Sequence, residues 1–148
     1  MLNSLQYLNF SEHMIEAIKF ALRYDPSPNP RVGAVLVDKN NKIKKITAHK
    51  EKDKDHAEYN LVKNSDITEN DTLYVTLEPC FHDDTSPSCA NAVLETNVQN
   101  IVVGDIDRDE RTNGKGIELL KNNDLNVSIE NGVNDFLNPG YKIKNDKP

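Results

Sequence analysis

The chain has 148 residues, of which 36% are hydrophobic and 28% are charged, a length that suits one globular domain with a hydrophobic core. Lys and Arg number 18 against 24 Asp and Glu, a formal charge of −6, which counts against a nucleic-acid partner bound through its phosphates. No apolar run reaches the roughly 18 residues that cross a bilayer, and the first residues lack a signal-peptide pattern. The composition therefore favours a cytoplasmic protein that acts on a small molecule, without nucleic acid or membrane as a partner.

The N-terminal part of the chain predicts one helix followed by two strands. Residues 11–24 carry apolar side chains at helical spacing behind Ser11, which is a suitable N-cap. The proline-rich segment that follows predicts an extended loop. An apolar run at 32–38 is typical of a buried strand, and two asparagines then suit a turn into a second strand at 42–47.

Helices and strands alternate in the rest of the chain. The expected elements are a helix at 56–64, a strand at 72–77, a helix from Pro87 or Cys89 to about Thr96, a strand at 100–107, a helix within 113–123, a strand at 125–131 and a closing helical turn within 133–142. This order predicts a three-layer α/β fold with a mixed sheet of about five strands between helices. We expect one domain over residues 1–148, with a polar tail at about 142–148.

Three potential metal ligands flank the strand expected at 72–77. His56, Cys80 and Cys89 supply one imidazole and two thiolates, which suit tetrahedral Zn²⁺ with the fourth position left for water. Glu58 lies two residues after His56, where a carboxylate can take a proton from such a water and deliver it to a leaving group. The cysteines could instead form a disulfide, but this pair beside a His and a Glu is more typical of a metal or catalytic site.

The order of these residues matches the H-x-E and P-C-x-x-C signature of zinc nucleobase deaminases. Here the signature appears as HAE and PCFHDDTSPSC, with eight residues between the cysteines instead of two. A structural zinc site is the main rival, because His82 could complete a set of four ligands.

Around this signature the chain resembles the pyrimidine deaminase domain of riboflavin biosynthesis, a branch of the cytidine-deaminase-like fold. The resemblance runs from about Met14 to Tyr141. Its matching pieces are NPRVGAVLV at 29–37, His49 ahead of HAE, YVTLEPC at 74–80, the long spacing to Cys89, and GKG at 114–116. Among zinc deaminases, the long spacing between the cysteines is characteristic of this branch.

The resemblance implies the fold, the reaction, the cofactor and further site residues. The reaction would be hydrolytic deamination of the diamino-ribosylamino-pyrimidinone 5′-phosphate, with Zn²⁺ as cofactor and Glu58 as proton carrier. Substrate contacts would come from Asn29, His49, Ala57, His82, Asp107 and Lys115. Related folds form dimers or tetramers and related deaminases are often fused to a reductase, so we expect a homo-oligomer without a reductase domain, and a separate reductase as a candidate partner.

The chain departs from this branch around the expected phosphate. Asp84 and Thr85 stand where the branch has a Gly and a basic residue, and DRDE at 107–110 replaces DPNP. Arg108 and Arg111 either supply the missing positive charge or are solvated surface residues. Deamination of another nucleobase or nucleoside, of a specialised-metabolism pyrimidine, or of tRNA or single-stranded DNA therefore stays open, as does a zinc-binding module without turnover.

The GKG stretch has two interpretations of its own. It either presents backbone N–H groups and Lys115 to an anion at a helix start, or forms a flexible helix entry with a solvated lysine.

Overall fold

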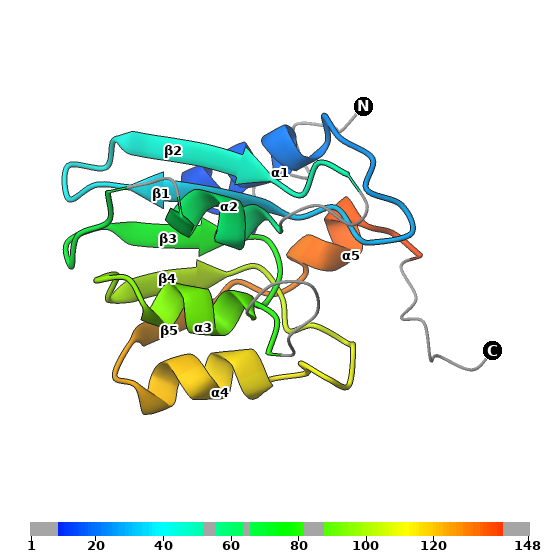
Figure 1. Cartoon of the computed structure of the whole chain (residues 1–148). Coiled ribbons are helices and arrows are strands. Elements are labelled where there is room, and N and C mark those ends of the chain that lie inside the picture. The colour runs from blue at the N-terminus through cyan, green and yellow to red at the C-terminus, as the bar shows by residue number, and fades with distance from the viewer. Residues whose placement is uncertain (1–8, 52–55, 64–65, 82–87, 141–148) are drawn as a thin grey trace.

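The computed structural model describes residues 9–51, 56–63, 66–81 and 88–140, which form one five-stranded mixed sheet with helices on both faces (Figure 1). The strands are β1 (Gly33–Val37), β2 (Ile43–Ala48), β3 (Thr72–Val75), β4 (Asn100–Val103) and β5 (Asn126–Ile129). The helices are α1 (Glu12–Ala21), α2 (Ala57–Lys63), α3 (Cys89–Leu94), α4 (Lys115–Asn122) and α5 (Val133–Leu137). The α/β fold expected from the sequence is confirmed.

The sheet has the strand order β2-β1-β3-β4-β5. β1 pairs antiparallel with both β2 and β3, whereas β3, β4 and β5 are parallel to one another. Parallel neighbours need a crossover connection, and here α3 joins β3 to β4 while α4 joins β4 to β5. The carboxyl ends of the three parallel strands consequently lie along one edge, on the right of Figure 1, where sites in open α/β sheets collect.

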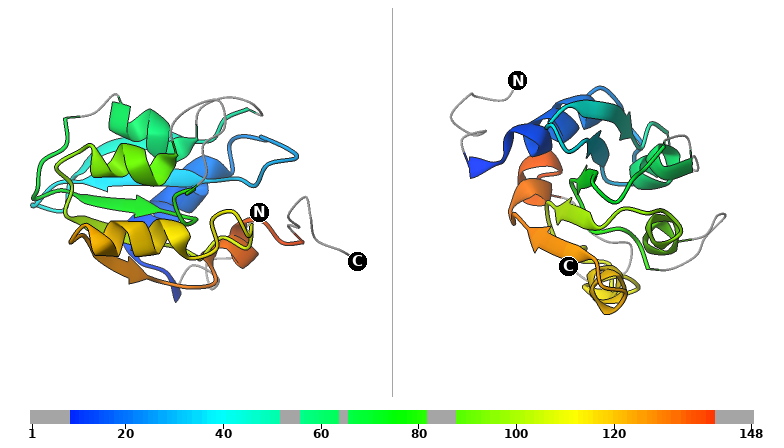
Figure 2. Two further views of the ribbon diagram at one scale, coloured as in Figure 1. Left: turned by 60° about the horizontal axis from the view of Figure 1, so that its bottom comes forward. Right: turned by 90° about the vertical axis from the view of Figure 1, so that its left-hand side faces the viewer.

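Apolar clusters on both faces of the sheet hold the helices to it. Figure 2 shows α2, α3 and α4 on one face and α1 and α5 on the other. The first cluster includes Leu36, Leu61, Leu73, Val93, Ile101 and Leu120, and the second includes Met14, Ile18, Val133 and Leu137. At Gly33 a Cβ would lie 2.1 Å from the carbonyl oxygen of Ala17, so glycine allows α1 to lie directly against β1.

Several elements end earlier than the sequence pattern predicts. β3 stops at Val75 and β4 at Val103, and the residues beyond them form loops at that end of the sheet. Ser11 does stand at the N-cap of α1, but its side chain makes no capping bond. Its hydroxyl instead donates to the Glu130 carboxylate, 119 residues away, which a local pattern could not indicate. Within the described residues, no helix is long and apolar enough to span a bilayer.

Candidate functional site

Three segments bring the predicted metal ligands together beyond the ends of the parallel strands. His56 directly precedes α2, Cys80 follows β3 by five residues, and Cys89 is the first residue of α3. Their ligand atoms all lie within 4.8 Å of one another. The Nδ1 atom of His56 is 3.4 Å from the Sγ atom of Cys89 and 3.8 Å from that of Cys80. One imidazole nitrogen and two sulfurs at this separation fit the donor set of Zn²⁺.

The two thiols influence each other strongly. A hydrogen bond from the Cys89 thiol lowers the pKa of Cys80 to about 4, and His56 contributes in the same direction. The same hydrogen bond, together with burial, raises the pKa of Cys89 above its ordinary value. The backbone N–H of Cys89 also donates to the Cys80 sulfur over 3.2 Å. Without metal the pair therefore holds one thiolate and one thiol, and metal binding must displace the remaining proton.

Glu58 stands in the first turn of α2, directly behind the cluster of ligands. Its side chain is only 3% exposed. Burial raises the pKa of Glu58 to about 7, although the nearby His56 opposes the rise. A carboxyl group with a pKa near neutrality can both accept and donate a proton at ordinary pH, as the predicted proton carrier must.

Two of the expected substrate contacts, Asn29 and His49, lie together on another side of the cluster. The Nδ2 atom of Asn29 is 3.1 Å from the Nε2 atom of His49. The His49 ring in turn meets the His56 ring edge to face, with their centroids 5.0 Å apart. His49 is 3% exposed, so it is a buried neighbour of the predicted metal ligand His56.

The other expected contacts are less directly placed. Ala57 packs its methyl group into the core cluster, and its carbonyl oxygen accepts a hydrogen bond from the Thr47 hydroxyl. A substrate contact from Ala57 would therefore have to come from its backbone. Lys115 has an exposed side chain. His82 lies outside the described residues, as do Asp84 and Thr85.

Glu78 is a buried glutamate whose hydrogen bonds hold several segments of this region together. The sequence pattern gave no indication of this role. Its carboxylate accepts hydrogen bonds from the backbone N–H groups of Asp107, Gly114 and Ile117, at 3.0, 2.8 and 3.0 Å. The anion at the start of α4 is thus the protein's own Glu78. The N–H of Gly114, in the GKG stretch, is therefore already bonded to Glu78, while a substrate contact from Lys115 stays a prediction.

The loop from Asp107 to Gly116 also packs closely against the loop that carries Pro79 and Cys80. A Cβ at Gly116 would lie 2.1 Å from the carbonyl oxygen of Pro79, so only glycine fits there without displacing the residue before Cys80. Arg111 faces the carboxylate of Asp109 within the loop, with its Nη2 atom 2.7 Å from Oδ2. The Arg111 guanidinium is thus paired with a carboxylate of its own loop.

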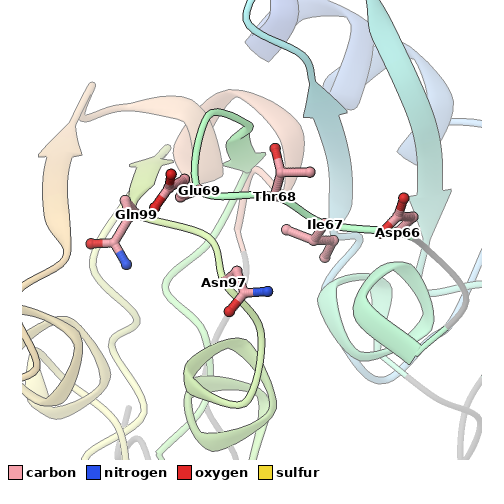
Figure 3. A pocket seen from close by; sticks show the side chains of 6 residues that line it. All are labelled: Asp66, Ile67, Thr68, Glu69, Asn97 and Gln99. Carbon is pink, nitrogen blue, oxygen red and sulfur yellow. The ribbon is translucent and has the colours of Figure 1, made fainter.

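A polar hollow of about 450 Å³ lies at the opposite end of the sheet. Figure 3 shows its lining, which comes from the segments ahead of β3 and β4, namely Asp66, Ile67, Thr68, Glu69, Asn97 and Gln99. These residues precede the strands, whereas Cys80 and Glu78 follow them. The hollow therefore has no part in the chemistry of the ligand cluster.

Comparison with known proteins connects this geometry to a family. Residues 9–105 match the cytidine and deoxycytidylate deaminase zinc-binding region, a span that contains all three ligands and Glu58. The diaminohydroxyphosphoribosylamino-pyrimidine deaminase of Buchnera aphidicola (Schizaphis graminum) is 33% identical over 120 residues, which are 79% of this chain and 81% of that protein. The chain belongs to the pyrimidine deaminases of riboflavin biosynthesis.

Other members of this deaminase family are longer than the chain. The riboflavin biosynthesis protein RibD of Aquifex aeolicus is 39% identical over 103 residues, covering 69% of this chain but 29% of that protein. The structure of Acinetobacter baumannii RibD superposes with a TM-score of 0.80 at 34% identity, covering 87% of this chain and 37% of that one. The resemblance drawn from the sequence is thus confirmed, and the likeness to RibD is confined to about a third of that protein.

Proposed function

We propose that this deaminase uses Zn²⁺ to hydrolyse an amino group of a diaminohydroxyphosphoribosylamino-pyrimidine, the compound named for its Buchnera relatives. The observation that carries the proposal is the cluster of His56, Cys80 and Cys89 beside the buried Glu58. A set of three protein ligands leaves a fourth coordination position for water. This geometry favours a catalytic over a structural site among the described residues.

The chain's own residues would divide the chemistry among them. Zinc, when bound by these ligands, lowers the pKa of a water molecule and so supplies a nucleophile near neutral pH. Glu58 would take one proton from the water and pass it to the ring nitrogen of the pyrimidine. It would then carry a second proton, from the hydroxyl group newly attached to the ring carbon, to the departing amine. The balance is one water consumed, one ammonia released and a carbonyl oxygen left on the ring. Asn29 and His49 would hold the ring against this centre.

The same proposal includes a reductase that acts after the deaminase. A Thermotoga maritima relative carries the name of a deaminase and a 5-amino-6-(5-phosphoribosylamino)uracil reductase. We infer that a reductase, in the same polypeptide or another, consumes the product of this deaminase. We also infer that the protein forms a homo-oligomer, because related folds form dimers or tetramers, and that it acts in the cytoplasm.

The test compares ammonia release by the purified unchanged chain with ammonia release by its Glu58→Gln variant. This change keeps the shape of the side chain but removes the group that accepts and donates the proton. We expect kcat to fall by a factor of about 10² to 10⁴, the usual contribution of general acid–base catalysis, while bound zinc per chain stays constant. The substrate panel should contain the phosphorylated pyrimidine, its dephosphorylated form, cytidine, deoxycytidylate and guanine.

Glu95→Gln is the matched control, because Glu95 is an exposed glutamate at the end of α3. It should retain the activity of the unchanged chain. Undiminished ammonia release by the Glu58 variant would remove Glu58 from the mechanism. Turnover of cytidine in preference to the phosphorylated pyrimidine and its dephosphorylated form would overturn the assigned substrate.

A further inference from the structure

The peptide group between Cys80 and Phe81 is held on both sides. The carbonyl oxygen of Cys80 accepts a hydrogen bond from the N–H of Ala90 over 3.1 Å. The N–H of Phe81 donates to the hydroxyl oxygen of Thr112 over 3.1 Å. Because a peptide group is planar and rigid, these two bonds together set its orientation. The orientation of the Cys80 side chain, and hence of its sulfur, depends on that plane.

Thr112 is well suited to hold its side of the peptide. It has no exposed surface, so water does not compete for the hydroxyl. Its backbone is tied within its own loop, since its N–H donates to the Asp109 carbonyl at 2.9 Å and its carbonyl accepts from Lys115 at 2.5 Å. Both ends of the loop are anchored by Glu78, through Asp107 and Gly114.

The hydrogen bond on the other side of the Cys80–Phe81 peptide comes from the segment that carries Cys89. Ala90 directly follows Cys89, and the N–H of Cys89 donates to the Cys80 sulfur at 3.2 Å. α3 therefore binds one side of the Cys80 peptide as well as the sulfur. The second side depends on Thr112, which comes from a segment 31 residues further along the chain than Phe81.

We propose that Thr112 is a positioning residue for the Cys80 metal ligand, an inference that rests on the proposed zinc site. Its hydroxyl keeps the Cys80–Phe81 peptide in the orientation that aims the sulfur at the metal. Partners outside the ligand shell that orient a ligand typically contribute a factor of 10 to 100 in metal affinity or activity. Thr112 thereby links the loop after β4 to the coordination of the metal.

The test compares metal binding by Thr112→Val, Thr112→Ala and Thr112→Ser, without substrate. Valine keeps the shape of threonine and loses the acceptor, alanine loses the acceptor without adding a methyl group, and serine retains the hydroxyl. We expect the valine and alanine variants to bind Zn²⁺ about tenfold more weakly, measured by competition with a chromophoric chelator. Their Co²⁺ forms should show altered thiolate-to-metal absorption bands, because the Cys80 sulfur is displaced, whereas Thr112→Ser should match the unchanged chain in both measurements.

Thr96→Val is the matched control, because the Thr96 hydroxyl also bonds to backbone, at Val93 and Val98, but at the far end of α3 from Cys89. It should leave zinc affinity and the Co²⁺ spectrum unchanged. Normal affinity and an unchanged spectrum in both the valine and alanine variants would overturn the role of Thr112. A failure of the proposed function looks different: the unchanged chain would then bind no zinc, or would bind it and release no ammonia.

Discussion

Asn29 and His49 are 20 residues apart in the sequence, yet their side chains form one hydrogen-bonded pair beside the predicted metal ligand His56. His49 is buried and packs edge to face on His56. Asn29 is half-buried and belongs to the loop that precedes β1. A polar amide held in this way, with further donor and acceptor capacity available to a ligand, suits recognition of the polar edge of a pyrimidine ring.

Replacing Asn29 with alanine should therefore weaken substrate binding and spare the metal. We expect KM to rise about tenfold, which corresponds to about 1.4 kcal/mol and lies within the usual cost of an unpaired buried polar group. The measurements are steady-state kinetics by ammonia release and zinc content per chain. Asn97→Ala, in the hollow at the opposite end of the sheet, is the control. A rise in KM for Asn97→Ala alone would assign the substrate to that hollow.

At the scale of elements, α5 shows how a very short helix can support the site. With five residues it is too short to be stable by itself. The carboxylate of Asp105, two residues beyond β4, accepts hydrogen bonds from the N–H groups of Gly132 and Asn134 at 3.0 and 2.7 Å. Beyond the helix, Asn138 bonds to both the N–H and the carbonyl of Arg31, at 2.7 and 2.9 Å. α5 thus ties the end of β4 to the loop that carries Asn29.

Asp105→Ala should destabilise the fold by about 1–2 kcal/mol, the usual cost of losing a helix cap. The reason is that two N–H groups at the start of α5 lose their acceptor. Urea unfolding at neutral pH measures the change. Asp135→Ala, an exposed acidic residue of the same helix, should change stability by less than about 0.5 kcal/mol. Equal effects of the two variants would mean that the cap contributes nothing specific.

At the scale of the whole molecule, the candidate metal centre joins three segments that are otherwise connected through the core. His56 leads into α2, Cys80 follows β3, and Cys89 begins α3. A ligand that binds only the folded arrangement stabilises the entire domain by mass action. Since the thiols must lose a proton to bind metal, this stabilisation should also weaken as the pH falls.

Removal of zinc with a chelator should lower the thermal midpoint by on the order of 10 °C. Free metal at 1,000 times its dissociation constant contributes about 4.1 kcal/mol, and a domain of this size shifts by about 2–4 °C per kcal/mol. Differential scanning calorimetry or circular dichroism provides the measurement. Added Zn²⁺ should restore the midpoint, while Mg²⁺ should not, because it prefers oxygen ligands. If the thermal midpoint stays unchanged although the metal has been lost, metal binding does not stabilise the fold.

The sequence by itself determined the fold class and the chemistry of the candidate centre. Apolar periodicity and turn residues predicted five strands in the observed order along the chain, because each of these signals acts between residues close in sequence. His56, Glu58, Cys80 and Cys89 could be selected because their residue types, order and spacing match the requirements of a catalytic metal site.

Only the tertiary structure decided how these residues are supported. Glu78 meets its hydrogen-bond donors 29 to 39 residues away, and Thr112 meets Phe81 31 residues away. No local pattern encodes such pairs, because their partners depend on how distant loops pack. The same holds for the raised pKa of Glu58, which results from burial by the whole fold and not from its neighbours in the sequence.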